Sequence, residues 1–199
     1  MKVVLATRNI AKMNMYSSLF HLLGVETSTP DSYGIFDSPE ETGLTSEENV
    51  LIKVAHYQIN EVPVFCEDVT LYVPWLNDNV LSSNVRALYG TQLDDENLII
   101  GWEHIVASLK PEERSGAWHV AYALSYNSHI FVDSHDFWFT FFLPASQKRI
   151  VGKPMSSIIG PSQFGKPESE LSEEEYCIYI QEHNNIVINI LKSLLENVQ

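Results

Sequence analysis

The chain has 199 residues, a formal net charge of −14, and a composition that is 45% hydrophobic and 11% aromatic. These values exclude an intrinsically disordered chain and fit a folded protein with a sizeable core. The negative charge argues against nucleic acid or an anionic membrane as partner, and no apolar run reaches the roughly 18 residues of a membrane span. Cys66 and Cys177 lie far apart without metal-ligand spacing, which favours a reduced, cytoplasmic compartment.

The first predicted elements are a strand at residues 2–6 and a helix at 10–23, joined by the polar turn Thr7-Arg8-Asn9. This turn places free backbone N–H groups and the positive end of a helix dipole at the end of a buried strand. Lys12 adds a positive charge one turn later. The combination suits an anion, above all a phosphate chain. Thr7 and Asn9 serve equally well as plain helix caps, so that alternative stays open.

Two further elements bring acidic residues into the pattern. A second helix is predicted at about residues 46–59, with Thr45 and Glu48 forming a capping box at its start. A buried strand is predicted at residues 62–66 and ends in Glu67-Asp68. Carboxylates at the carboxyl end of a buried strand are where open α/β sheets place ligand chemistry. For a single acid, a solvated strand end is the simpler interpretation.

The rest of the chain predicts helices, long strands and loops, which together indicate the α/β class. The strands within residues 117–143 either extend a central sheet or form a second lobe. In chain order the elements are an irregular segment at 71–90, a helix at about 92–109, and strands across an antiparallel turn at Asn127-Ser128. A loop at 144–168 and a helix capped by Ser172 follow. This helix runs to about Val198, and a break in it is expected near Asn184-Asn185.

Four stretches carry motifs in a consistent order over about residues 1–90. Residues 5–12 read Leu-Ala-Thr-Arg-Asn-Ile-Ala-Lys, residues 41–53 read Glu-Thr-Gly-x-Thr-x-x-Glu-Asn-Val-x-x-Lys, residues 67–71 read Glu-Asp-Val-Thr-Leu, and residues 85–90 read Val-Arg-Ala-Leu-Tyr-Gly. Together they resemble the inosine triphosphate pyrophosphatase (Ham1-type) family. Its corresponding motifs are Ala-Thr-x-Asn-x-Gly-Lys, Glu-Thr-Gly-x-Thr-Phe-x-Glu-Asn-Ala-x-x-Lys, Asp-Asp-Ser-Gly-Leu and, more weakly, Ser-Ala-Arg-x-x-Gly.

The resemblance implies one α/β domain over residues 1–199, elongated and two-lobed. A central mixed sheet would be flanked by helices, with a cleft between the lobes and the second lobe built mainly from about residues 75–145. It also implies a Mg²⁺-dependent hydrolase, usually a homodimer. Such enzymes cleave nucleoside triphosphates between the α and β phosphates, releasing the monophosphate and pyrophosphate, and prefer deaminated purines.

The resemblance also assigns roles to individual residues. Asp68 would be the catalytic base and Glu67 a second catalytic acid, and Mg²⁺ would bind Glu41 and Asp68. A triphosphate carries about four negative charges, so a protein of net charge −14 must meet it with local cations, a metal ion, or both. The residues predicted to bind the phosphates are Thr7, Arg8, Asn9, Lys12, Lys53 and Arg86.

The C-terminal third departs from the family pattern. The family reads its purine with a Gly-Phe-Gly-Tyr-Asp-Pro loop and a later Lys-Asn-x-Ile-Ser-His-Arg run. Here residues 160–165 read Gly-Pro-Ser-Gln-Phe-Gly, and residues 176–182 read Tyr-Cys-Ile-Tyr-Ile-Gln-Glu, without the lysine, histidine and arginine. We therefore expect an altered base preference.

Two alternatives accompany this hypothesis. One is a degenerate relative that binds a nucleotide or a partner without turnover, which the C-terminal losses favour. An aromatic residue such as Tyr176 filling the base pocket would strengthen it. The other is the related Maf-type pyrophosphatase family, against which the segment at residues 41–53 argues.

Overall fold

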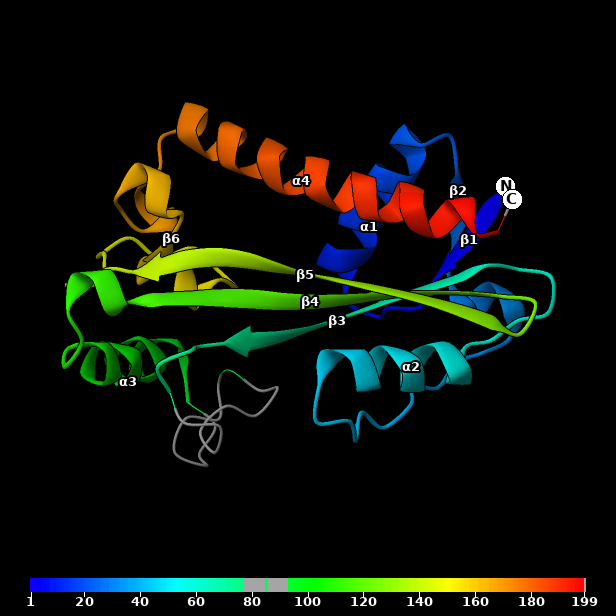
Figure 1. The fold of residues 1–199 in the computed structure, drawn as a ribbon, viewed down its shortest axis with the longest axis horizontal. Helices are drawn as coiled ribbons and strands as arrows, with labels where there is room; N and C mark the ends of the chain where they lie inside the picture. The colour runs from blue at the N-terminus through cyan, green and yellow to red at the C-terminus, as the bar shows by residue number, and fades with distance from the viewer. Residues whose placement is uncertain (77–84, 86–92, 199) are drawn as a thin grey trace. The chain divides into compact units, whose positions relative to one another are not determined.

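The computed structural model describes residues 1–76, 85 and 93–198, and its contacts divide the chain into two compact units. Unit 1 comprises residues 1–69, 120–135 and 183–199, and unit 2 comprises residues 70–119 and 136–182. Six strands form one sheet in the order β2-β1-β3-β4-β5-β6 (Figure 1). Parallel pairs join β1 to β2 and β3, and β5 and β6 are antiparallel, so the predicted mixed sheet of an α/β fold is confirmed.

Unit 1 begins with β1 (Lys2–Leu5), α1 (Ile10–Leu22), β2 (Glu26–Ser28) and the short 3-10 helix η1 (Pro30–Tyr33). The strand is buried at Val3, Val4 and Leu5 because the sheet is covered on both faces. The first helix is followed by Gly24, whose φ of 71° suits glycine. The N–H groups of Gly24 and Val25 donate to the carbonyl groups of His21 and Phe20, which satisfies the last turn of the helix.

The next helix, α2 (Ser46–His56), begins at the predicted cap and ends earlier than predicted. Thr45 Oγ1 accepts from Glu48 N at 3.2 Å, but the Glu48 carboxylate accepts from Leu44 N at 2.6 Å instead of closing the box on Thr45. The helix does not reach residue 59, because residues 59 and 62 pair in a bridge around Glu61, whose φ is 60°. That turn redirects the chain into the next strand.

The strand β3 (Val64–Tyr72) corrects the prediction of a short strand ending before Glu67-Asp68. Both acids lie in its middle. Successive side chains of a strand point to opposite faces. Accordingly Val64 and Cys66 pack in one cluster with α2, whereas Phe65 contacts the ring of Tyr16 from α1 at 4.9 Å between centroids. Figure 1 shows α2 on one side of the unit 1 strands and α1 on the other.

The strands β4 (Ser115–Tyr126) and β5 (His129–Phe141) are neighbours joined by the predicted two-residue turn. Asn127 and Ser128 have φ values of 47° and 65°, as a tight hairpin requires. β5 is one continuous strand. The predicted loop at residues 144–168 contains β6 (Ile159–Gly160) and three short 3-10 helices, which are η4 (Pro154–Ser157), η5 (Ser162–Phe164) and the start of η6 (Glu168–Glu170).

Unit 2 has its own core, built around α3 (Asp95–Val106). Asp94 caps the start of this helix, and the short helix η3 (Pro111–Glu113) lies between α3 and β4 in the chain. Trp102 of α3 stacks on Phe141 of β5 with ring centroids 5.2 Å apart. Met155, Ile158 and Ile159 complete this cluster with residues of β3 and β5. The segment after β5 is therefore held by apolar packing.

The last helix, α4 (Glu173–Glu196), runs without the break predicted near Asn184-Asn185. Its apolar stripe continues past the two asparagines through Val187 and Leu191, which are fully buried. Its start is the predicted capping box, because Ser172 and Glu175 exchange backbone-to-side-chain hydrogen bonds of 2.7 and 3.2 Å. In the described residues, none of the helices is both long and apolar enough to cross a membrane.

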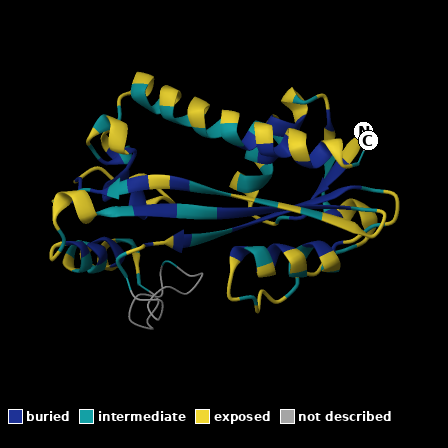
Figure 2. Ribbon diagram, viewed as in Figure 1, coloured by how far each residue is buried: buried dark blue, intermediate teal, exposed yellow. Residues whose placement is uncertain are grey.

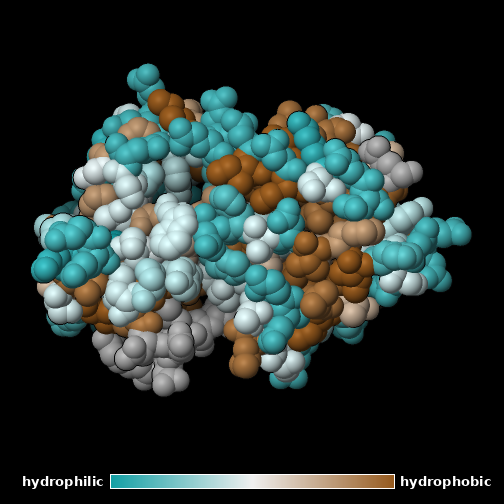
Figure 3. All heavy atoms as spheres, viewed as in Figure 1, coloured by the Kyte–Doolittle hydropathy of each residue, from teal (hydrophilic) through white to brown (hydrophobic). Residues whose placement is uncertain are grey.

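Burial follows this layering. In Figure 2 the strands are largely buried, whereas the outer sides of α2 and α4 are exposed. The face shown in Figure 3 mixes hydrophilic and hydrophobic residues. Exposed apolar side chains such as Phe36 and Leu44 are normal on a protein surface and do not by themselves mark a docking site.

The hairpin turn yields a stability prediction. Ser128→Gly should raise the free energy of unfolding by about 0.5–1 kcal/mol, because glycine adopts a positive φ without the steric cost that serine bears. Ser134→Gly, within β5, should lower it by a similar amount. Urea denaturation of both variants measures this, and equal effects of the two substitutions would contradict the assignment of the turn.

Candidate functional site

A polar cavity of about 290 Å³ lies in unit 1 where β1 ends. β1 pairs with β3 as far as Leu5, opposite Phe65, and the chain then turns into α1. β3 continues past this point, so β1 does not cover Glu67 and Asp68. The residues that line the cavity are Ala6, Thr7, Arg8, Asn9, Lys12, Ser38, Pro39, Glu41, Lys53, Tyr57, Glu67 and Asp68.

The structure therefore brings the predicted site residues together. All eight that fall within the described residues line this one cavity: Thr7, Arg8, Asn9, Lys12, Glu41, Lys53, Glu67 and Asp68. Arg86, the remaining predicted phosphate ligand, lies outside the described residues.

Glu67 is held on the α1 face of β3. Its side chain is only 4% exposed, and Lys12 Nζ forms an ion pair with Oε1. Tyr16 donates from its hydroxyl to Oε2 at 3.3 Å. Burial, and then the charge of Glu67, raise the pKa of Tyr16, so the phenol stays protonated and keeps its role as donor. Both oxygens of this buried carboxylate are thus partnered.

Asp68 is held in the same way on the opposite face, by α2. Lys53 Nζ donates to Oδ1 at 2.7 Å, and Asn49 Nδ2 donates to Oδ2 at 3.2 Å. The Asn49 amide is itself oriented by Gly43 N, which donates to Asn49 Oδ1 at 2.9 Å. A methyl group on Gly43 would lie 2.6 Å from that oxygen, so the glycine allows this close approach. The Asp68 carboxylate is consequently fixed in orientation.

Lys53 links the acids of the cavity. Besides Asp68, its ammonium contacts Glu41 Oε1 at 3.2 Å and the backbone oxygen of Glu67 at 3.2 Å. Burial lowers the pKa of Lys53, but the hydrogen bond and charge of Asp68, with those of Glu41, outweigh it and leave the pKa above its ordinary value. Lys53 is therefore a cation shared by Glu41 and Asp68.

The turn after β1 supplies hydrogen-bond groups at the start of α1. Asn9 Oδ1 accepts from Ala11 N and Lys12 N at 2.9 and 3.2 Å, and Thr7 Oγ1 accepts from Asn9 N at 3.2 Å. Asn9 therefore caps α1, which was one of the two interpretations of this turn, whereas Thr7 bonds within the turn itself. The Asn9 amide N–H groups and the Thr7 hydroxyl can still donate hydrogen bonds to an anion.

Arg8 shapes the cavity wall. Its guanidinium donates to Ser38 Oγ at 3.0 Å and to the Asp37 carbonyl at 3.2 Å, and it forms an ion pair with Asp31 at 3.2 Å. Tyr57 also donates to the Asp37 carbonyl, at 3.1 Å. These bonds tie the segment that carries Ser38 to the turn after β1.

Asn49 and Tyr16 were not predicted to be site residues. A signal for both was present, because residues four apart lie on the same face of a helix. Asn49 precedes Lys53 by four residues on α2, and Tyr16 follows Lys12 by four on α1. Each helix thus presents a lysine and a second donor to one carboxylate.

The donor set fits a hard cation. Within the parts of the chain that the structure describes, no three His, Cys, Asp or Glu side chains converge closely enough to hold a metal alone. Mg²⁺ is commonly held by one or two carboxylates together with waters and substrate phosphates. Glu41 and Asp68, which already share the Lys53 ammonium, are such a pair.

Solved structures place this fold in a known class. The chain is similar to the Ham1 protein of Staphylococcus aureus, with a TM-score of 0.76 and 22% sequence identity over 100% of both chains. At this identity the likeness establishes the α/β fold. The Ham1 family model matches residues 3–137, and the chain belongs to the Ham1 family.

Two curated relatives match the chain, one over about half of its length and the other over nearly all of it. The dITP/XTP pyrophosphatase of Leptospira interrogans is 32% identical over 96 residues, a match that spans about half, 48%, of each chain. The dITP/XTP pyrophosphatase of Pectobacterium atrosepticum is 28% identical over 202 residues, covering 98% of each chain.

The capping role of Asn9 can be tested by substitution. Asn9→Ala should lower the free energy of unfolding by about 1 kcal/mol, because Oδ1 caps α1. Asn9→Asp should retain the cap and most of the stability, because aspartate is an equally good cap. Thermal unfolding of both variants measures this, and a loss in Asn9→Asp as large as in Asn9→Ala would refute the capping role of the oxygen.

Proposed function

We propose that this protein is a Mg²⁺-dependent nucleoside triphosphate pyrophosphatase. It hydrolyses the bond between the α and β phosphates and releases a nucleoside monophosphate and pyrophosphate. The observation that carries the proposal is the convergence of three cations and three carboxylates, each fixed by its own contacts, on one cavity at the start of a helix. The curated names of the matched relatives, dITP/XTP pyrophosphatase, support the same reaction.

The charges in the cavity support the proposal that a metal ion is required. The cations Arg8, Lys12 and Lys53 are balanced by an equal number of acids within the cavity. A triphosphate adds about four negative charges to a chain of net charge −14, which is unfavourable without further cations. Bound Mg²⁺ would neutralise phosphate oxygens and polarise the reacting phosphoryl group. Glu41 and Asp68 would hold it.

The chain's own residues bind the phosphates and activate water. Lys12 and Lys53 supply charge, while Thr7 and Asn9 offer protons to phosphate oxygens at the helix start. Asp68 accepts a proton from the attacking water, and its donors Lys53 and Asn49 keep the carboxylate oriented. Glu67 holds Lys12 at the edge of the cavity.

Asp68→Asn tests the catalytic assignment. Loss of the base should reduce pyrophosphate release by about 100-fold or more, with the fold retained, because general-base catalysis contributes factors of this size. The measurement is pyrophosphate release with Mg²⁺ from ITP, XTP, dITP and the standard nucleotides. Asp133→Asn on β5 is the matched control and should leave turnover unchanged, since Asn can still accept the bond that Asp133 Oδ1 takes from Ser134 N.

Two outcomes would contradict the proposal in different ways. Near-normal turnover in Asp68→Asn would remove Asp68 as the base while leaving the reaction in place. No pyrophosphate release from any nucleotide by the folded protein would favour a relative that binds without turnover.

Glu41→Gln tests the metal assignment. Because amide oxygen is a weaker ligand for a hard cation than carboxylate, the Mg²⁺ concentration for half-maximal activity should rise by about tenfold. Glu40→Gln, a neighbouring exposed acid, should leave it unchanged. Equal Mg²⁺ dependence of the two variants would exclude Glu41 as a ligand. We also propose that the protein forms a homodimer and that it binds neither nucleic acid nor a membrane.

A further inference from the structure

Two buried tyrosines lie close to Glu67 in unit 1. Tyr16 of α1 and Tyr122 of β4 are 2% and 0% exposed, and their rings meet edge to face with centroids 6.5 Å apart. Both rings also pack against Phe65 of β3, with centroids 4.9 and 6.3 Å away. Because residues two apart on a strand share a face, Phe65 and Glu67 point to the same side of β3. The Glu67 carboxylate is therefore enclosed by an aromatic cluster that carries two hydroxyl groups.

The two hydroxyl groups differ in their hydrogen bonds. Tyr16 donates to Glu67 Oε2 at 3.3 Å, whereas the buried Tyr122 hydroxyl has no hydrogen-bond partner among the described residues. A buried hydroxyl without a partner is unfavourable, so packing alone does not account for a tyrosine at residue 122. Burial, and then the charge of Glu67, raise the pKa of Tyr122 against the opposing effect of the nearby Tyr16 hydroxyl. The phenol of Tyr122 therefore keeps its proton and can donate it in a hydrogen bond.

Lys12 is the partner of Glu67 that can move. Its ammonium pairs with Glu67 Oε1, but its side chain is 33% exposed and lines the polar cavity of unit 1. A phosphate chain in that cavity would attract the same ammonium with several negative charges. The buried Glu67 carboxylate cannot turn to water instead, and a buried carboxylate without partners is costly. A shift of Lys12 towards a phosphate must therefore be offset by other donors to Glu67.

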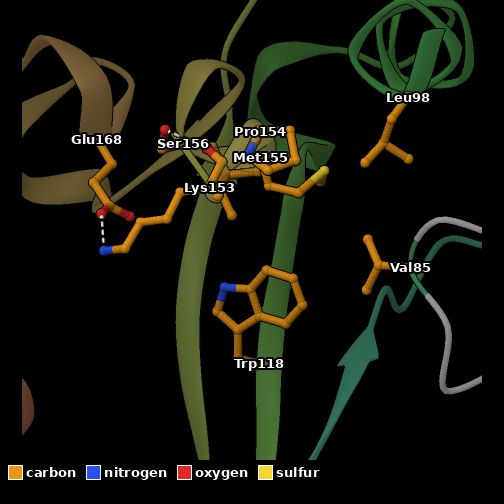
Figure 4. Close-up of a pocket in the computed structure, with 10 residues that line it drawn as sticks. Val85, Leu98, Trp118, Lys153, Pro154, Met155, Ser156 and Glu168 are labelled. Atoms are coloured by element: carbon orange, nitrogen blue, oxygen red, sulfur yellow. Dashed lines mark hydrogen bonds and ion pairs between the residues drawn. The ribbon is translucent and has the colours of Figure 1, made fainter. Parts of the chain in front are cut away.

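A lysine–glutamate pair in unit 2 provides a contrast within the same chain. Lys153 Nζ contacts Glu168 Oε1 at 3.1 Å, and both residues line a cavity of about 360 Å³ (Figure 4). Tyr176 accepts a hydrogen bond from this ammonium at 3.3 Å, whereas Tyr16 donates to the carboxylate of its pair. The Lys153 side chain is 51% exposed, so water can replace a lost partner there. At the buried Glu67, only side-chain donors can do so.

We propose that Tyr16 and Tyr122 are positioning residues of the phosphate site, which hold the charge of Glu67 when the Lys12 ammonium turns from this carboxylate to a phosphate chain. Tyr122 then donates to the Tyr16 oxygen, which makes Tyr16 the stronger donor to Glu67. Lys12 is thereby released to the ligand without leaving an unpaired buried charge behind. That the ligand is a phosphate chain rests on the proposed function, whereas the exchange of partners rests on the contacts of Glu67.

Tyr122→Phe is the decisive variant. The ligand is methylenediphosphonate with Mg²⁺, a pyrophosphate analogue that is not hydrolysed, and its affinity is measured by isothermal titration calorimetry. Tyr122→Phe should weaken binding by about fivefold or more, because the donor to Tyr16 is lost. The same substitution should not lower the midpoint of thermal unfolding of the ligand-free protein, since the hydroxyl that it removes has no partner there among the described residues. A purely structural role for Tyr122 would leave the affinity unchanged.

Two further tyrosine variants calibrate this result. Tyr16→Phe should weaken binding by about tenfold and should also destabilise the ligand-free protein, because it removes a hydrogen bond to a charged group that is already present there. Tyr126→Phe is the matched control, since Tyr126 lies on the same strand as Tyr122 but does not line the polar cavity. Its affinity for methylenediphosphonate should match that of the unsubstituted protein.

Glu67→Gln tests whether the tyrosines act through the charge of the carboxylate. Glutamine keeps the shape of the side chain but carries no charge for the phenols to hold. In the Glu67→Gln protein, addition of Tyr122→Phe should therefore change the affinity by less than about twofold, so that the two substitutions are not additive. An equal loss of affinity from Tyr122→Phe with and without the Glu67 charge would overturn the proposal. Thermal unfolding of each variant confirms that it is folded.

The outcomes separate this proposal from the proposed function. Methylenediphosphonate binding that depends on Tyr122 and on the Glu67 charge would support the exchange even if the protein releases no pyrophosphate from any nucleotide. Unchanged affinity in Tyr122→Phe would overturn the exchange even if pyrophosphate release is observed. Failure of the folded, unsubstituted protein to bind methylenediphosphonate would overturn it as well, whatever the result of the pyrophosphate assay.

Discussion

Two adjacent carboxylates in the middle of a strand constrain the structure more than any other feature. Glu67 and Asp68 point to opposite faces of β3, where each would cost several kcal/mol if buried without a partner. On either face, a helix supplies a lysine and a second donor one turn apart. Lys12 and Tyr16 reach Glu67, and Lys53 and Asn49 reach Asp68. The positions of α1 and α2 on the sheet are thus tied to one dipeptide.

The cavity follows from the unequal lengths of two neighbouring strands. β1 pairs with β3 only as far as Leu5, and the turn into α1 leaves the two acids beside an open space. Because the turn is also a helix start, the open space joins acids on one side to helix N–H groups and cations on the other. The Lys53 ammonium forms ion pairs with both Glu41 and Asp68 and so connects the segment before α2 to β3. Within this small volume three cations are balanced by three carboxylates.

The C-terminal third of the chain differs from the rest in how well it matches the family. The Ham1 family model covers residues 3–137, and the motifs that depart from the family pattern lie beyond it. The same part of the chain carries the ion pair of Lys153 with Glu168, and Tyr176 accepts a hydrogen bond from Lys153. Tyr176 lies against the Lys153 ammonium, with its ring centroid 5.7 Å away. The chain lacks the family's C-terminal lysine, histidine and arginine, and this part of it carries the Lys153–Glu168 ion pair.

The sequence by itself determined the α/β class, the family, and eight of the residues that line the first cavity, because these depend on local periodicity and on motifs of fixed spacing. The tertiary structure alone decided that Glu67 and Asp68 lie within a strand and that Asn49 and Tyr16 hold them. Two adjacent acidic residues predict the end of a strand, because burial of their charges requires partners. Here those partners come from positions distant in the sequence. The continuity of α4 past Asn184-Asn185, and the pairing of Lys153 with Glu168, likewise depend on contacts that periodicity does not encode.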